Sequence, residues 1–375
     1  MSIKVVSIVS RMNVGGPAVL LSELIRRLPS DQFSHTLITG RCLDNEIDFL
    51  DAHPLDSKVI YVDDIQRSIL PIADIRSLIR LVRILRNENP NIVHTHTSKA
   101  GVIGRIASRI ANPQIIVIHT FHGHLLYGYF SKFKTRLIVI LEIVLAKITN
   151  VFVAVTEQVK LDLIGVGIGT NSKWAIIHPG VSASRYLSKQ DARDLLKIGN
   201  NKFVYSWIGR FTDIKNPMLA IQAFENIENK SELYFLMAGD GELLEECMSY
   251  ARARNLPINF LGWITDINPI LSASDFVLMT SRNEGMPVVI VESALKGVPV
   301  LTTDVGGVTE FVADGVTGWL IEQNAELISQ KISGLIKNIG LIEPIGKNAQ
   351  RFANNEFSVE MFVDEHVSLY NEVAH

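Results

Sequence analysis

The sequence predicts an α/β protein of two doubly wound domains, each with a parallel sheet covered by helices on both faces. Short apolar runs alternate with longer helical patterns from residue 3 to residue 178, and the alternation restarts after residue 193. Such alternation is typical of βαβ units, whose strands are parallel and buried on both faces. The length of 375 residues also indicates two domains rather than one.

Thirteen strands are predicted, seven in the first series and six in the second. They cover residues 3–9, 35–39, 59–62, 92–95, 115–120, 151–155 and 174–178, then 203–207, 234–238, 259–261, 276–279, 299–302 and 318–321. Helices are expected between them, for example over 19–28, 75–86 and 102–111. We place the first domain at 1–182 and the second at 183–356. The last helix has no strand after it, so we expect segment 357–375 to pack back on the first domain.

Composition and charge exclude several classes of protein. Cys42 and Cys247 lie too far apart for a metal knuckle and suggest no disulfide framework, which fits a reducing cytoplasm. No run of about 18 clean apolar residues occurs, and the start does not resemble a signal peptide. Up to Ser182 there are 20 Lys and Arg against 14 Asp and Glu, and beyond it 16 against 25. A basic first half and an acidic second half suggest that the two domains meet different partners.

Two carboxylates eight positions apart mark the most informative segment. Glu284 follows the predicted strand 276–279, and Glu292 lies in a helix predicted over 287–295, with Pro287 in its first turn. Glu292 is then roughly 7.5 Å farther along the helix axis, and free N–H groups at the helix start form an anion site. This spacing suits a diphosphate flanked by carboxylates that bind sugar hydroxyls. It suits a plain βα turn with two solvated glutamates equally well.

Glycines and cations follow other strands. Gly15 and Gly16 let the backbone approach an anion closely, although a plain tight turn fits as well. Arg210 and Lys215 follow the first strand of the second domain and together can neutralise a diphosphate, whereas each alone reads as an exposed loop charge. No Asp-x-Asp is present to hold Mg²⁺ against a diphosphate, so we expect no metal and no cofactor.

Histidines cluster at two strands. Alternation places His94 and His96 on one face of a strand, and His119, His122 and His124 follow at the next strand. Zinc is conceivable, but no cysteine or suitably spaced helical pair joins these residues. We favour the polar lining of a cleft, with His122 just past a strand end.

Together these pieces resemble the retaining glycosyltransferases of family 4, which have the GT-B fold of two facing Rossmann-like domains. The match is collinear over nearly the whole chain, and its most specific part is the Glu-x₇-Glu pair with Arg and Lys upstream. The matching pieces are Gly15-Gly16, residues 94–101 and 121–124, Gly209-Arg210 with Lys215, residues 238–241, Glu284-Gly285-Met286-Pro287 with Glu292, and residues 304–307.

The resemblance implies how the donor's phosphates are bound. In the Gly15-Gly16 loop, Gly16 would bring a backbone N–H to the β-phosphate, and Arg210 and Lys215 would hold the departing diphosphate. The reaction would retain anomeric configuration, proceed without a metal, and depend mainly on electrostatic stabilisation of the leaving group.

It also implies how the donor's sugars are bound. Glu284 would accept hydrogen bonds from donor-sugar hydroxyls, near the backbone of Gly285, Met286 and Pro287, while Glu292 would bind the ribose. His122 would touch the donor sugar near the reacting carbon. The donor would be a nucleotide sugar, a UDP-linked hexose or N-acetylhexosamine. Ser182 and Thr309 depart from the residues common in relatives at these places, which leaves the donor's identity open.

Two other functions share this architecture. A UDP-sugar 2-epimerase would need acid–base residues in the cleft, and His122 could serve as one. A non-catalytic sugar- or nucleotide-binding protein would be expected to lose Arg210, Lys215 or Glu284, and all three are present. The transferase is therefore our prediction.

The acceptor is predicted from the first domain. Between Arg76 and Arg136 there are ten basic residues and one acid, Glu88. A predicted helix places Arg76, Arg80 and Arg83 on one face and Ile75, Leu78, Ile79 and Val82 on the other. Farther on, the aromatic residues Tyr127, Tyr129, Phe130 and Phe133 interleave with Lys132, Lys134 and Arg136. We expect a lipid-carried or glycan acceptor in cell-surface polysaccharide or glycolipid synthesis, an anionic membrane surface at the inner face of the plasma membrane, and no nucleic acid. An ordinary solvated helix face beside a hydrophobic cleft wall is the alternative.

Overall fold

The computed structural model describes residues 2–13, 15–43, 46–65, 70–123, 126, 131–182 and 186–374. The chain divides into two compact units, one of Met1–Val181 with Ser358–His375 and one of Ser182–Phe357. The domain limits predicted from the sequence lie one residue from these limits. Each unit contains a parallel sheet with helices packed on it, which confirms the predicted fold class.

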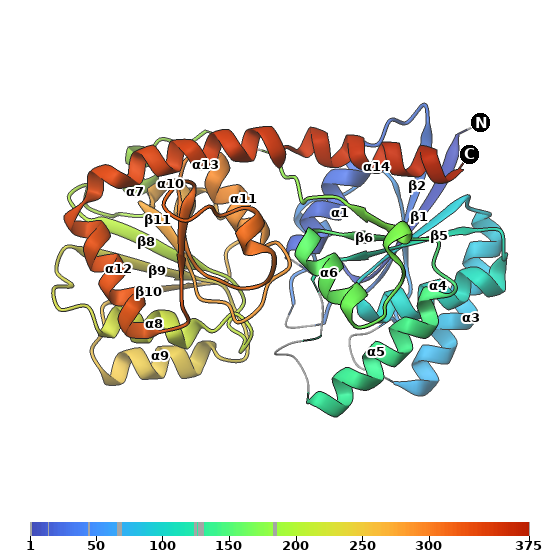
Figure 1. The fold of residues 1–375 in the computed structure, drawn as a ribbon, viewed down its shortest axis with the longest axis horizontal. Coiled ribbons are helices and arrows are strands. Elements are labelled where there is room, and N and C mark those ends of the chain that lie inside the picture. The colour runs from blue at the N-terminus through green and yellow to red at the C-terminus, as the bar shows by residue number, and fades with distance from the viewer. Residues whose placement is uncertain are drawn as a thin grey trace. The chain divides into compact units, whose positions relative to one another are not determined.

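In the described residues, the first unit has a sheet of seven strands in the order β3-β2-β1-β4-β5-β6-β7. Figure 1 shows this sheet with helices packed on it. All neighbouring strands are parallel, and β1 pairs with β2 from Ile3 opposite Phe33 and with β4 from Val5 opposite Ile92. The strands are β1 (Ile3–Arg11), β2 (Phe33–Gly40), β3 (Lys58–Tyr61), β4 (Ile92–His96), β5 (Ile116–Phe121), β6 (Val151–Ala154) and β7 (Trp174–Ile176).

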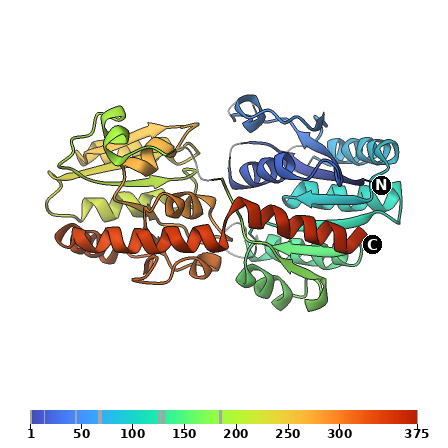
Figure 2. The same cartoon turned by 90° about the horizontal axis from the view of Figure 1, so that it is seen from above.

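Helices cover both faces of this sheet. They are α1 (Gly16–Arg27), α2 (Phe49–Ala52), α3 (Pro71–Glu88), α4 (Ser98–Ala111), α5 (Lys132–Ala146), α6 (Glu157–Gly165) and the C-terminal α14 (Val359–Ala374). The α14 helix packs against α1, and both chain ends lie in this unit (Figure 2). The α3, α4 and α5 helices lie next to one another on the other side of the sheet, with α4 in contact with both neighbours.

The buried face of α3 is formed mainly by residues other than its isoleucines. Ile75 and Ile79 are 59% and 47% exposed, whereas Ala73, Ser77 and Leu81 are buried. The small side chains of Ala73 and Ser77 allow α3 to pack closely on its neighbours, so the helix turns its bulkier isoleucines outward. Part of the apolar face predicted from the sequence, Ile75 and Ile79, is therefore exposed.

In the described residues, the second unit has a sheet of six parallel strands in the order β10-β9-β8-β11-β12-β13. The strands are β8 (Phe203–Ile208), β9 (Leu233–Ala238), β10 (Ile258–Gly262), β11 (Phe276–Met279), β12 (Val300–Thr303) and β13 (Gly318–Ile321). The helices are α7 (Lys189–Leu195), α8 (Pro217–Glu225), α9 (Leu244–Ala253), α10 (Asn268–Ala273), α11 (Val288–Leu295), α12 (Ala325–Lys337) and α13 (Ile342–Glu356). Its core contains an aromatic stack, in which the ring of Tyr205 lies 4.4 Å from that of Phe235 and 5.1 Å from that of Phe276.

Several predictions about the acceptor side concern residues outside the described ranges. His124, Tyr127, Tyr129 and Phe130 lie there, whereas Phe133 belongs to α5. No helix in the described part of the chain is long and apolar enough to cross a membrane.

Candidate active site

The loops at the carboxyl edge of the second sheet pack backbone against backbone. A Cβ added at Gly239, where φ is +135°, would lie 1.8 Å from the carbonyl oxygen of Gly209. A Cβ added at Gly306, where φ is +55°, would lie 1.9 Å from the carbonyl oxygen of Glu284. Only glycine is tolerated at such contacts, so these two glycines fix the loops that follow β8 and β11.

Lys215 and Glu284 form an ion pair between these two loops. Ser281 donates its hydroxyl to the same carboxylate oxygen at 2.6 Å. The side chains of Lys215 and Glu284 are 23% and 11% exposed, so water screens their attraction less than it would at the surface. Within the described residues, the other oxygen of Glu284, Oε2, accepts no hydrogen bond. That oxygen remains available to a ligand hydroxyl.

Thr280 anchors the loop that carries Lys215. Its hydroxyl donates to the carbonyl oxygen of Asn216 at 2.8 Å and accepts from the indole N–H of Trp207 at 3.1 Å. The backbone N–H of Arg282 also donates to the carbonyl of Ile214 at 2.8 Å. The cation of Lys215 is therefore held on a loop with little freedom to move.

Arg210 is an exposed cation at this edge. It lies two residues after the end of β8, and no described acidic residue forms an ion pair with it. Arg282, on the β11 loop, instead pairs with Asp213 at 3.4 Å. Arg210 and Lys215 thus lie five positions apart on one loop, where both can approach the same anion.

Glu292 lies inside α11, eight positions after Glu284. The helix begins at Val288, and Pro287 is its extended N-cap residue (φ −70°, ψ 122°) rather than a residue of its first turn. Glu292 is half-buried, and burial raises the pKa of its carboxyl to about 7, with Asp266 adding to the rise and Lys296 opposing it. Near neutral pH this carboxyl is therefore only partly ionised, unlike an ordinary glutamate.

Gly285 and Met286 connect Glu284 to this helix and are buried, as is Pro287. The side chain of Met286 is only 6% exposed. These residues offer a ligand their backbone rather than their side chains.

In the first unit, Gly15 and Gly16 begin α1. Gly15 is extended (φ 161°, ψ 169°), and its carbonyl accepts the first helical hydrogen bonds, from Ala18 and Val19. No side chain caps this helix and no acidic residue lies in its first turn. A Cβ at Gly15 would contact only the carbonyl of Asn13, at 3.9 Å, so space within the unit does not require glycine there. The absence of a side chain leaves the helix start open to an anion.

Of the predicted histidines, His94 and His119 belong to the core. His94 hydrogen-bonds Tyr370 of α14 at 2.7 Å and Thr120 at 2.6 Å. His119 hydrogen-bonds Thr95 at 2.9 Å. Burial lowers the pKa of both imidazoles well below the usual value, so they stay neutral and act as buried polar links.

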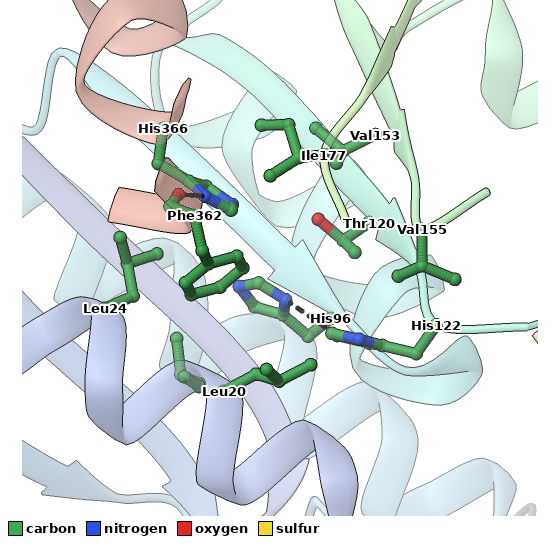
Figure 3. Close-up of a pocket in the computed structure, with 11 residues that line it drawn as sticks. Leu20, Leu24, His96, Thr120, His122, Val153, Val155, Ile177, Phe362 and His366 are labelled. Carbon is green, nitrogen blue, oxygen red and sulfur yellow. Dashed lines mark hydrogen bonds between the residues drawn. The ribbon is translucent and has the colours of Figure 1, made fainter. Parts of the chain in front are cut away.

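His96 and His122 face each other at a small pocket of about 10 Å³, the space of roughly one water molecule (Figure 3). Nδ1 of His96 lies 3.2 Å from Nε2 of His122, and the rings are stacked with centroids 5.4 Å apart. The remaining ring nitrogens, Nε2 of His96 and Nδ1 of His122, are buried without a partner among the described residues. Burial lowers the pKa of His122 to about 4. His122 is thus a neutral imidazole with one unused polar atom.

The pocket wall comes from elements far apart in the sequence. Leu20 and Leu24 of α1 lie on one side, and Phe362 and His366 of α14 lie on another (Figure 3). No group of three or more His, Cys, Asp or Glu side chains in the described ranges is arranged to hold a metal ion.

Two side chains at the β11 loop were not assigned roles from the sequence. Ser281 hydrogen-bonds Glu284, and Thr280 anchors the Lys215 loop. The only signal for Ser281 was its separation of three residues from Glu284, short enough for the two side chains to meet in one loop. Nothing in the local sequence indicated the role of Thr280, because Asn216, whose carbonyl it bonds, lies 64 residues earlier.

Comparison with known proteins gives matches over both units. The family model described as Glycosyltransferase Family 4 matches residues 14–185, and the one described as Glycosyl transferases group 1 matches residues 188–352. The chain is 32% identical over 362 residues to the UDP-Gal:alpha-D-GlcNAc-diphosphoundecaprenol alpha-1,3-galactosyltransferase of Escherichia coli, covering 92% of this chain and 91% of that protein. It is 27% identical over 327 residues to the capsular polysaccharide biosynthesis glycosyltransferase CapM of Staphylococcus aureus, covering 84% and 86% of the two chains.

Solved structures match the fold over the whole chain. A crystal structure of HepE from Anabaena in complex with UDP and glucose has a TM-score of 0.83 at 22% identity, covering 99% of this chain and all of that one. Sucrose-phosphate synthase from Thermosynechococcus elongatus has a TM-score of 0.84 at 18% identity, with 99% of each chain covered. At such low identity these likenesses establish the GT-B fold and nothing finer.

Proposed function

Because the chain belongs to glycosyltransferase family 4, we propose that it transfers a sugar from a UDP-sugar donor to a lipid-linked glycan. The sugar is a hexose or N-acetylhexosamine, the anomeric configuration is retained, and no metal ion or cofactor takes part. The Escherichia coli relative, whose name specifies a UDP-galactose donor and a diphosphoundecaprenol-linked acceptor, supports the choice of substrate classes. The capsule-synthesis relative supports a role in cell-surface polysaccharide assembly.

The observation that carries the proposal is the Lys215–Glu284 ion pair, on loops that also present the exposed Arg210. Arg210 and Lys215 neutralise the diphosphate as the glycosidic bond to it breaks, which is the main catalytic contribution. Glu284 accepts hydrogen bonds from donor-sugar hydroxyls through its unused oxygen. Since the loops are fixed by Gly239 and Gly306, these groups need little rearrangement in the transition state.

The remaining residues bind the rest of the donor. Glu292 accepts hydrogen bonds from the ribose hydroxyls, and the backbone after Glu284 contacts the donor sugar. Gly16 brings its N–H to the β-phosphate, and His122 contacts the sugar near the reacting carbon. The pKa of His122, lowered to about 4 by burial, suits a neutral hydrogen-bonding role and not that of an acid at neutral pH.

The test is to offer UDP-galactose, UDP-N-acetylglucosamine, UDP-glucose and GDP-mannose, each with and without GlcNAc-diphospholipid as acceptor. We expect release of UDP and a heavier acceptor with one UDP-sugar, with the new linkage in the same anomeric configuration as the donor. Conversion of the donor sugar without an acceptor would instead indicate an epimerase. Donor binding without any turnover would indicate a binding protein.

A further inference from the structure

The α5 helix exposes an unusual amount of apolar surface. Only Glu142, Leu145 and Ala146 among its fifteen residues are buried. Five large apolar side chains are between 42% and 72% exposed, and their spacing places them on one side of the helix. They are Phe133, Leu137, Ile140, Leu141 and Val144. An apolar stripe of this kind on a helix surface indicates an interaction site.

All the charged side chains on the exposed side of α5 are basic. Lys132, Lys134 and Arg136 are exposed at the N-terminal end, and Lys147 is exposed just after the helix. No described acidic side chain forms an ion pair with any of them. Cations at a helix N-terminus oppose the helix dipole, so local helix stability does not explain why the sequence places three there.

The one carboxylate of α5 is turned inward. Nη2 of Arg105 on α4 donates to both carboxylate oxygens of Glu142 at 2.8 Å, and its Nε donates to the carbonyl of Gly101. Arg105 is fully buried and Glu142 is nearly so. This pair anchors α5 to α4 and removes the only negative charge from the exposed surface.

We propose that this exposed surface of α5 docks on an anionic lipid bilayer. Basic side chains beside an apolar stripe match both parts of such a surface, since phosphate headgroups attract the cations and the acyl region accepts Phe133 and the leucines. A second copy of the chain fits less well, because basic residues lie at both ends of α5. Parallel or antiparallel pairing would therefore bring cations against cations.

The α3 helix provides a comparison within the same unit. It also exposes isoleucines, Ile72, Ile75 and Ile79 among them. Two of its arginines have described partners, Arg76 with Asp64 at 3.1 Å and Arg80 with the carbonyl of Tyr61 at 3.2 Å, whereas Arg83 is exposed. The α3 helix therefore exposes apolar side chains with fewer unpaired cations than α5, and its isoleucines serve as a comparison surface.

The proposal is tested by co-sedimenting the full chain with vesicles of phosphatidylcholine alone and of phosphatidylcholine with phosphatidylglycerol. We expect binding to the anionic vesicles that weakens as salt is added. The triple variant Lys132→Gln, Lys134→Gln and Arg136→Gln should bind roughly 100-fold more weakly, the loss expected for three basic residues near an anionic surface. Leu137→Gln with Ile140→Gln should also weaken binding, whereas Ile72→Gln with Ile75→Gln on α3 should bind like wild type. Glutamine is a good helix former at all these positions.

Transferase activity on a water-soluble acceptor is measured for every variant and should stay at the wild-type level, which shows that the fold and the proposed reaction are intact. If the proposed function is wrong, the wild-type protein will show no transferase activity, whether or not it binds vesicles. Equal binding to neutral and anionic vesicles, no binding to either, or unchanged binding by both α5 variants would overturn the docking proposal. So would a dimer that the α5 variants dissociate, which would identify a second copy as the occupant.

Discussion

Lys215 and Glu284 form an ion pair across two loops of the second unit, and Ser281 donates to the same oxygen of Glu284 at 2.6 Å. Replacing either partner leaves a partly shielded charge without its neighbour. Effects on stability and on catalysis must therefore be measured separately for this pair.

Arg210→Ala and Lys215→Ala should each reduce kcat/KM by roughly 100- to 1,000-fold, because one preorganised donor to a developing charge contributes about that much. Steady-state kinetics with the accepted UDP-sugar measures the loss, and thermal unfolding separates it from instability. Arg282→Ala is the matched control, since Arg282 is on the neighbouring loop but pairs with Asp213. Activity should survive excess EDTA. Near-wild-type turnover in both variants, or a strict need for Mg²⁺, would contradict the proposed stabilisation of the leaving group.

Glu284→Gln and Glu292→Gln should damage different steps. Glu284→Gln should lower kcat, because it weakens hydrogen bonds to the reacting sugar and leaves Lys215 unpaired, while affinity for free UDP changes little. Glu292→Gln should weaken binding of UDP itself. Calorimetric titration of both variants with UDP and with GDP measures the difference and identifies the base. Unchanged UDP affinity in Glu292→Gln would mean that the ribose is bound elsewhere.

Much of the fold could be predicted from the sequence because buried strands of parallel sheets are nearly uniform apolar runs. The β11 and β13 strands have the predicted bounds for this reason. The buried face of α3 could not be predicted, since isoleucines lie on more than one side of that helix and the packing of Ala73 and Ser77 decides the matter. Periodicity finds bulky residues, whereas close helix packing selects small ones.

The sequence indicated individual residues of the candidate site but not the contacts between them. Spacing along the chain identified Lys215 and Glu284, but their ion pair joins residues 69 positions apart and depends on the order of β8 and β11 in the sheet. The same holds for His96 and His122, which face each other because β4 and β5 are adjacent. Sheet order is a tertiary property, and local patterns do not encode it.

Glu292 should make the second unit less stable as pH rises. Its folded-state pKa of about 7 lies above the ordinary 4.5, so between these values the folded state binds more protons than the unfolded state. Stability therefore falls as pH rises through this window. Glu292→Gln removes the effect, and its advantage over wild type should grow from about pH 5 to about pH 8 in denaturant unfolding, on the order of 1–3 kcal/mol. A constant difference across this range would show that Glu292 does not titrate there. Affinity for UDP should rise over the same range, because ionised Glu292 is the better acceptor for ribose hydroxyls.

The histidines should give the first unit the opposite response to pH. Burial lowers the pKa of His122 and of His366 to about 4 and that of His35 to about 3, while that of His96 is lowered as well. Below pH 6.5 the unfolded chain binds protons at these positions and the folded unit does not, so stability is lost as pH falls from 6.5 towards 4.

The second unit is a built-in control for this effect, because Ser182–Phe357 contains no histidine. Hydrogen exchange of the backbone amides, corrected for the intrinsic rate, should show β4 and β5 losing protection between about pH 7 and about pH 5, while β8 and β11 keep theirs. Equal loss in both sheets would mean that carboxylates rather than histidines govern acid stability. If protection in β4 and β5 were unchanged, the imidazoles could accept protons without leaving the folded unit, and the neutral role assigned to His122 would have to be abandoned.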